Sequence, residues 1–176
     1  MSTTLEHCKQ YLDHRQWTYQ PHDQTLLTGV TLANQQTLAI VIRISENGEY
    51  LQLQAPQLYH IKEHHYKGVI FQSIASIQYQ YKLLRLEYDI RDGEIRAAIE
   101  LPLEDAELTH RQFDRCLDSL IYLTTQIVQP RLNAILASGE DPGTVALAQQ
   151  LLEQLPPQLV RDLQQLLSDR HPDNHP

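Results

Sequence analysis

The chain has 176 residues, and its 14 Lys and Arg are outnumbered by 22 Asp and Glu, for a formal net charge of -8. That length fits one domain, or one domain with an appendage. Binding to nucleic acid or to an anionic membrane surface requires a basic face, so neither partner is expected. No apolar stretch approaches the roughly 18 residues of a membrane span, and the N-terminus has no basic and apolar leader. We therefore expect a cytoplasmic protein without membrane insertion.

The first third of the chain predicts one helix and a three-stranded meander. Thr3 and Glu6 have the spacing of a capping box, and the apolar residues that follow predict a helix over about 3–15. Strand-length runs rich in Leu and β-branched residues come next, at 26–33, 38–45 and 50–55. Asn47-Gly48 tolerates the positive φ angles of a tight turn, so the second and third runs should form a hairpin. Pro56 should end the meander, and the polar segment after it should be irregular.

The middle of the chain predicts a helix, a second hairpin and a long helix. Apolar residues spaced by three and four favour a helix over 67–80. Apolar and polar residues then alternate over 84–101 on both sides of Asp92-Gly93, which indicates a hairpin. Thr109 begins a capping box and a wide apolar stripe, and Pro130 should kink or interrupt that helix.

These elements follow the order α-β-β-β-α-β-β-α, which predicts an α+β fold with an antiparallel sheet and helices packed on one face. We assign residues 1–137 to this domain and 138–143 to a linker. Two short amphipathic helices are expected within 144–168, before a disordered tail at 169–176. Such short helices are unstable alone, so they should dock on the core, on a twin subunit or on a partner.

Several segments match a known family. They are Trp17 to Tyr19, LTGV at 27–30, AIVIR at 39–43, Tyr50 to Pro56, and LEYDIRDGEIRAAIELPLEDAELTHRQFDRCLDSL at 86–120. In their order and spacing they resemble the YbjN-like family, which shares the fold of type III secretion chaperones. The resemblance covers about residues 3–137, and the segment 144–168 departs from it.

The resemblance implies a function. In secretion chaperones the fold forms a small acidic homodimer that holds a client segment in extended form. We accordingly expect a non-enzymatic, ATP-independent chaperone or assembly adaptor that binds a client or regulatory protein. The alternative is a stress-response or signalling modulator that acts through protein contacts.

Three groups of residues are candidates for protein contacts. Residues 87–118 hold ten acidic and four basic side chains, a net charge of -6, which could steer a basic client or simply aid solubility. The proposed acidic partner-facing stripe comprises Glu94, Glu100, Glu104, Asp105 and Glu107. The proposed subunit interface comprises Ile70, Phe71, Ile74 and Ile77. A helix that docks on the core or a partner would present Leu159, Leu163 and Leu166.

No group of residues predicts a catalytic, cofactor or metal site. His60, His64 and His65 have chelating spacing if helical, but a solvated loop is the favoured interpretation. Cys8 and Cys116 fall on apolar stripes and are expected to be buried, inert thiols. Tyrosines also suit protein interfaces, because they join apolar area to a hydrogen-bonding tip. Those that stand out are Tyr59, Tyr66, Tyr79, Tyr81, Tyr88 and Tyr122; core packing is the commoner explanation for the last two.

Overall fold

The computed structural model describes residues 3–32, 35–104, 106–143, 156 and 158–161. Its centre is a six-stranded antiparallel sheet with the strand order β1-β2-β3-β4-β6-β5. The strands are β1 (Gln20–His22), β2 (Thr25–Thr31), β3 (Thr37–Ser45), β4 (Tyr50–His60), β5 (Leu84–Tyr88) and β6 (Glu94–Pro102). The helices are α1 (Leu5–His14), α2 (Lys67–Gln80), α3 (His110–Tyr122) and α4 (Gln129–Ser138), with a 3-10 turn η1 (Glu46–Gly48) and a π-helical segment η2 (Leu123–Val128). The expected α+β fold is confirmed.

Both predicted hairpins form. In the first, Ser45 pairs with Tyr50 across a four-residue connection, and Glu46, Asn47 and Gly48 all have positive φ angles. In the second, β5 and β6 pair, and the connection places Gly93 at a φ of 85°. Side-chain alternation and turn residues are local signals, so the sequence alone located both hairpins.

Two prolines led to wrong predictions of where strands begin and end. β4 does not end at Pro56 but continues to His60, because Pro56 lies where the pairing with β6 shifts register at a bulge between Ala55 and Tyr59. The strand β1 was not predicted at all, since Pro21 indicated a break. Proline is tolerated there because β1 is an edge strand and needs no partner on its outer side.

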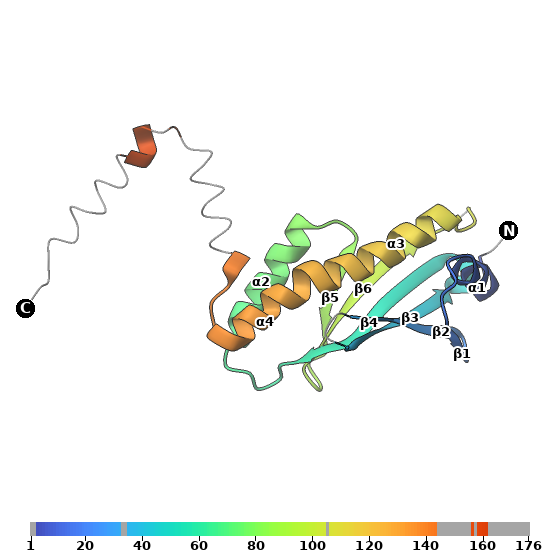
Figure 1. Ribbon diagram of the computed structural model, residues 1–176, viewed down its shortest axis with the longest axis horizontal. Coiled ribbons are helices and arrows are strands. Elements are labelled where there is room, and N and C mark those ends of the chain that lie inside the picture. The colour runs from blue at the N-terminus through green and yellow to red at the C-terminus, as the bar shows by residue number, and fades with distance from the viewer. Residues whose placement is uncertain (1–2, 33–34, 105, 144–155, 157, 162–176) are drawn as a thin grey trace, which may run out of the picture.

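One face of the sheet packs against the helices. The cross-strand row that faces them is buried on every strand from β2 to β5 and comprises Leu26, Ile42, Leu53, Ile99 and Leu84. Figure 1 shows the long helical segment from α3 to α4 running along the sheet, with α2 beside α4 and α1 at the opposite end. Phe113 of α3 is fully buried at the centre of this core.

The N-cap of the first helix lies one residue later than expected. Thr4 is its N-cap, and the Thr4 backbone N–H donates to His7 Nδ1 at 3.0 Å. Thr3 is instead buried, and its hydroxyl accepts a 2.9 Å hydrogen bond from the Leu108 N–H. Thr3 therefore fixes the start of the chain to the loop before α3 rather than capping α1.

The long helix has the predicted start and the predicted interruption. Thr109 Oγ1 accepts from the Gln112 N–H at 3.2 Å, and the Gln112 side chain accepts from the Thr109 N–H at 2.9 Å. The π-helical segment η2 precedes Pro130, which occupies the first turn of α4. Because proline lacks an N–H, a widened turn before it accommodates the missing helical hydrogen bond. No helix in the described part of the chain is long and apolar enough to cross a membrane.

Candidate functional site

No helix within the described residues covers the face of the sheet opposite α1, α2, α3 and α4. One cross-strand row on this open face runs through Gln20, Leu27, Val41, Gln54, Ala98 and Arg85. Leu27 lies opposite Val41, and Gly29 lies opposite Ala39 in the same pair of strands. We call Leu27, Gly29, Ala39 and Val41 the apolar patch. Leu27 is 37% exposed, Gly29 and Ala39 are exposed, and Val41 is half-buried, so the patch is accessible.

Gly29 adds no side chain to the apolar patch, and the neighbouring strand leaves little room for one. A Cβ at this position would lie 2.9 Å from the Leu38 carbonyl oxygen and 3.0 Å from a methyl group of Thr37. A larger residue would therefore both disturb the neighbouring strand and stand above the surface. An exposed apolar surface on a sheet can receive apolar side chains of an extended peptide or of another sheet.

Charged side chains of β5 and β6 and glutamines of β4 cover the other half of the open face. Glu100 accepts hydrogen bonds from Arg85 and from Gln52, the latter at 2.6 Å. Glu87 joins the same network through Arg85 and Arg96, each at 2.6 Å. Glu100 is 12% exposed and already paired, so it has little freedom to bind a partner.

The other members of the acidic stripe are not contiguous with Glu100. Glu94 lies at the far end of β6, where it accepts from the Gln57 N–H at 2.8 Å. Glu104 and Glu107 are exposed and form no ion pair with the described residues, whereas Asp105 lies outside them. The partner-facing role of the stripe remains a prediction, and within the described residues Glu104 and Glu107 are members that form no ion pair.

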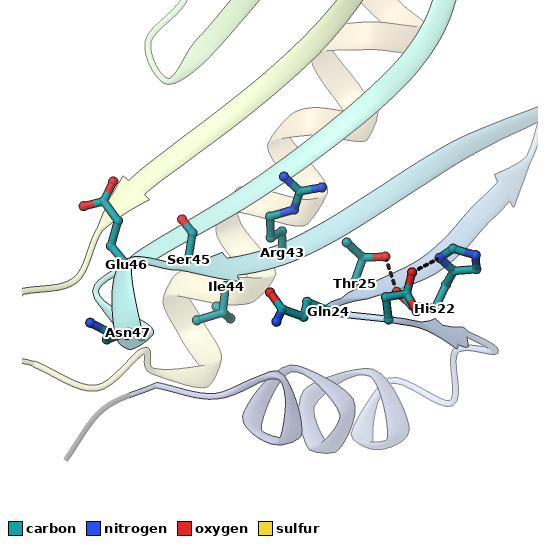
Figure 2. Close-up of a pocket in the computed structure, with 10 residues that line it drawn as sticks. His22, Gln24, Thr25, Arg43, Ile44, Ser45, Glu46 and Asn47 are labelled. Carbon is teal, nitrogen blue, oxygen red and sulfur yellow. Dashed lines mark hydrogen bonds and ion pairs between the residues drawn. The ribbon is translucent and has the colours of Figure 1, made fainter.

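An open pocket of about 950 Å³ lies where the β1–β2 and β3–β4 turns approach each other. Figure 2 shows the Arg43 and Glu46 side chains rising from β3 and its turn, with His22 and Gln24 across the pocket. Arg43 shares a cross-strand row with Thr25 and Gln52, so it borders the apolar patch. Its guanidinium is exposed and forms no ion pair with the described residues, which leaves a cation available beside an apolar surface.

The four residues of the proposed subunit interface on α2 differ in their surroundings. Ile70, Ile74 and Ile77 are buried in the chain's own core, at 8% exposure or less. Phe71 is 37% exposed and packs edge-on against Tyr88, and Lys67 Nζ lies 5.7 Å from the centre of its ring. Of the four, only Phe71 is placed to contact a second molecule without disrupting the core.

The two edges of the sheet are partly blocked. β1 has only three residues, and its Pro21 has no N–H to offer an incoming strand. At the other edge, the Leu86 N–H of β5 donates to Gln78 Oε1 of α2 at 2.8 Å. Both features discourage strand addition, so the open face is the better candidate for a binding surface.

Within the segment 138–143, expected to be a linker, Ser138 ends α4 and residues 139–143 are attached to the domain. Arg131 of α4 forms two parallel hydrogen bonds with Asp141, at 2.7 and 2.8 Å, and the two side chains are only 10% and 9% exposed. The Arg131 guanidinium beside Asp141 holds the pKa of that carboxyl below its usual range. Gly139, at a φ of 81°, ends α4 against the Tyr66 ring. Sequence patterns do not predict this attachment, because no local signal pairs Arg131 with Asp141.

The three candidate histidines lie at the end of β4 and in the segment after it, and the two cysteines lie in α1 and α3. His60 ends β4, while His64 and His65 stack with ring centres 4.7 Å apart. No group of three or more potential metal ligands occurs among the described residues. Cys8 and Cys116 are buried as expected, and burial raises the pKa of the Cys8 thiol to about 12 and that of Cys116 above its ordinary value.

The tyrosines and the C-terminal leucines occupy different positions. Tyr59 is partly buried, and its hydroxyl donates to Asn133 Oδ1 at 2.7 Å, whereas Tyr79 is 92% exposed. Tyr122 is 58% exposed, so its expected core position is wrong: it falls at the edge of the apolar stripe. Leu159 is exposed, while Leu163 and Leu166 lie outside the described residues, as does almost all of 144–168.

No protein-family model matches the sequence, and no curated protein gives a significant match. The solved structures that superpose on this chain include the following three. YbjN from E. coli, described as a proposed transcription regulator, has a TM-score of 0.57 and 10% identity over 74% of this chain and 92% of its own. In the ExsC–ExsE complex the matching chain has a TM-score of 0.52 and 16% identity over 73% of this chain and 96% of its own. In the HopA1–SchA chaperone–effector complex the values are 0.49 and 14%, over 68% and 88%. The first two superpositions show that this chain has the YbjN-like fold of the type III secretion chaperones.

Proposed function

We propose that this protein is a non-enzymatic, ATP-independent chaperone or assembly adaptor that holds a segment of a client protein. One observation carries the proposal: the sheet has a helix-covered face and an open face, and the open face bears the apolar patch. Soluble proteins use contiguous exposed apolar surface mainly for contacts with other molecules. In the ExsC–ExsE complex, a chain of the same fold is bound to another protein.

The surroundings of the apolar patch suit an extended segment. Gln20 and Gln54 flank the patch in its cross-strand row and can hydrogen-bond to a peptide backbone, while Leu27 and Val41 contact apolar side chains. The net charge of -8 attracts a client with basic flanks, which would raise the rate of encounter more than the affinity. The exposed side chains of Glu104 and Glu107 contribute to that attraction.

Photo-crosslinking in cells tests the proposal directly. A photoreactive phenylalanine analogue is placed at Val41 in the apolar patch and, as a control, at Tyr122 on the exposed side of α3. We expect position 41 to give one dominant protein adduct whose yield does not change when ATP is depleted. Equal adducts at both positions, or none at position 41, would count against the proposal.

A homodimer formed through α2 is part of the proposal. Phe71 is accessible and already sits against Tyr88, so a second Phe71 could complete an aromatic cluster at a twofold axis. Size-exclusion chromatography with light scattering should give a dimer at micromolar concentration and a monomer for Phe71→Glu. A wild-type monomer would contradict the dimer, and a dimeric Phe71→Glu variant would move the interface elsewhere.

A regulatory role is the second candidate, favoured by the fold shared with YbjN of E. coli. It would use the same open face and would differ only in the partner. The crosslinked adduct separates the two: an assembly component or secreted protein supports the chaperone, and a regulator or kinase supports a stress-response or signalling modulator.

A further inference from the structure

A second accessible surface lies on the helical side of the molecule. Its lining residues fall between Ser76 and Gly143 in the sequence, whereas the apolar patch belongs to β2 and β3. It is a groove of about 1010 Å³ between the C-terminal end of α2 and the segment formed by η2 and α4. Its lining is mainly carbon and includes Tyr79, Tyr81, Ile127, Pro130, Ala134 and Pro142. Tyr79 is 92% exposed, so the described residues leave this groove uncovered.

The chain itself enters this groove and is fixed there. Pro142 and Gly143 form part of the lining, and the Gly143 N–H donates to Asp141 Oδ1 at 2.8 Å. Asp141 is in turn held by Arg131, whose Nη2 also lies 3.3 Å from the Ser76 hydroxyl of α2. A Cβ at Gly143 would lie 2.1 Å from Arg131 Cζ, so a larger residue would displace the guanidinium that holds Asp141.

We propose that the groove is the docking site of the segment 144–155 of the same chain. This segment, TVALAQQLLEQL, begins directly after Gly143 and places Leu147, Leu151 and Leu155 four residues apart. That spacing gives one apolar stripe if the segment is helical, over a length of about 18 Å. An isolated helix of twelve residues is marginal in water, so the stripe requires an apolar surface to be stable.

The attachment at Gly143 makes docking within one chain the favoured arrangement. A segment joined to its site without any spacer experiences an effective concentration in the millimolar range or higher. A second copy of the chain at micromolar concentration competes poorly with such a segment. The docked leucines would cover the rings of Tyr79 and Tyr81, and the proposal is independent of whether the open face binds a client.

Hydrogen–deuterium exchange on the full-length protein tests this inference. We expect the amides of 147–155 to exchange at least tenfold more slowly than in an unstructured peptide. Leu151→Asp, on the segment, and Tyr79→Asp, on the groove, should each remove this protection. Tyr79 is almost fully exposed, so its substitution should leave the fold intact, and Tyr122→Asp on α3 is the matched control that should change nothing. Unprotected amides in the wild-type protein would overturn the proposal.

Crosslinking identifies the occupant. Cysteines introduced at positions 79 and 151 are joined by a short bismaleimide, while the native Cys8 and Cys116 stay unreactive because they are buried. We expect an adduct within one chain whose yield is independent of protein concentration. An adduct between two chains, favoured at high concentration, would overturn docking in cis and assign the groove to a second copy. A yield no higher than that of cysteines at 122 and 151 would also overturn it.

Discussion

Asp141→Asn is the sharpest test of whether residues 139–143 belong to the folded domain. The wild-type carboxylate receives two hydrogen bonds from Arg131 and one from the Gly143 N–H, and it is 9% exposed. The substitution keeps the shape of the side chain but leaves the Arg131 guanidinium desolvated and without a counter-charge. Loss of one partner from a buried ion pair costs about 3 kcal/mol of unfolding free energy.

Urea unfolding followed by far-ultraviolet circular dichroism measures this loss. The same loss should also appear in thermal unfolding: in a chain of this length, about 3 kcal/mol lowers Tm by about 6–12 °C. Glu6→Gln is the control, because it removes an exposed ion pair with Lys9 and should not change stability measurably. Equal stability of the Asp141→Asn and Glu6→Gln variants would refute the reasoning and return 139–143 to the status of a linker. Joint replacement by Arg131→Met and Asp141→Leu should recover part of the loss, since no charge is then left unpaired.

The same ion pair has a defined pH dependence. Arg131 lowers the pKa of Asp141 in the folded state, so the pair stabilises the protein above the unfolded pKa of about 3.9. That stabilisation disappears as the pH falls through the lower, folded-state pKa. The stability difference between wild type and Asp141→Asn should therefore be complete at pH 7 and should shrink below about pH 4.

Three further predictions concern other parts of the fold. Thr3→Val removes the hydroxyl that accepts from the Leu108 N–H and should destabilise the protein by about 1–3 kcal/mol in urea unfolding, whereas Thr31→Val, at an exposed site, should not. Gly139→Ala places a methyl group 2.5 Å from the Tyr66 ring at a positive φ, so unfolding free energy should fall by at least about 1 kcal/mol. Because burial raises the pKa of the Cys8 thiol to about 12 and also raises that of Cys116, a thiol reagent at pH 8 should modify both only in denaturant; rapid labelling of the native protein would contradict their burial.

The parts of the fold that the sequence predicts well depend on local chemistry. The Thr109–Gln112 capping box, the turn at Gly93 and the strand alternation on either side of it are all readable within a few residues. The prolines were misread because their effect depends on position in the sheet. Pro21 is accepted by an edge strand and Pro56 by a bulge, and neither environment is visible before the strands are assembled.

The candidate surfaces were harder to predict, because a sequence shows that a stripe is apolar but not what covers it. Ile70, Ile74 and Ile77 suggested an interface, yet they pack on the chain's own sheet. Glu100 was expected to face a partner, yet its carboxylate accepts hydrogen bonds from Arg85 and Gln52 on the two neighbouring strands. The apolar patch was missed for the opposite reason: Leu27, Ala39 and Val41 belong to strands that also face the core, and only the register shows which side chains remain on the open face.

Calorimetric titration of the crosslinked partner into the full-length protein, without nucleotide, tests the central claim most directly. Wild type and the Tyr122→Asp control should bind the partner equally. Val41→Asp, which puts a charge in the centre of the apolar patch, should weaken binding at least tenfold, about 1.4 kcal/mol, while leaving the circular dichroism spectrum unchanged. Equal binding by Val41→Asp and wild type would contradict the assignment of the open face as the client-binding surface.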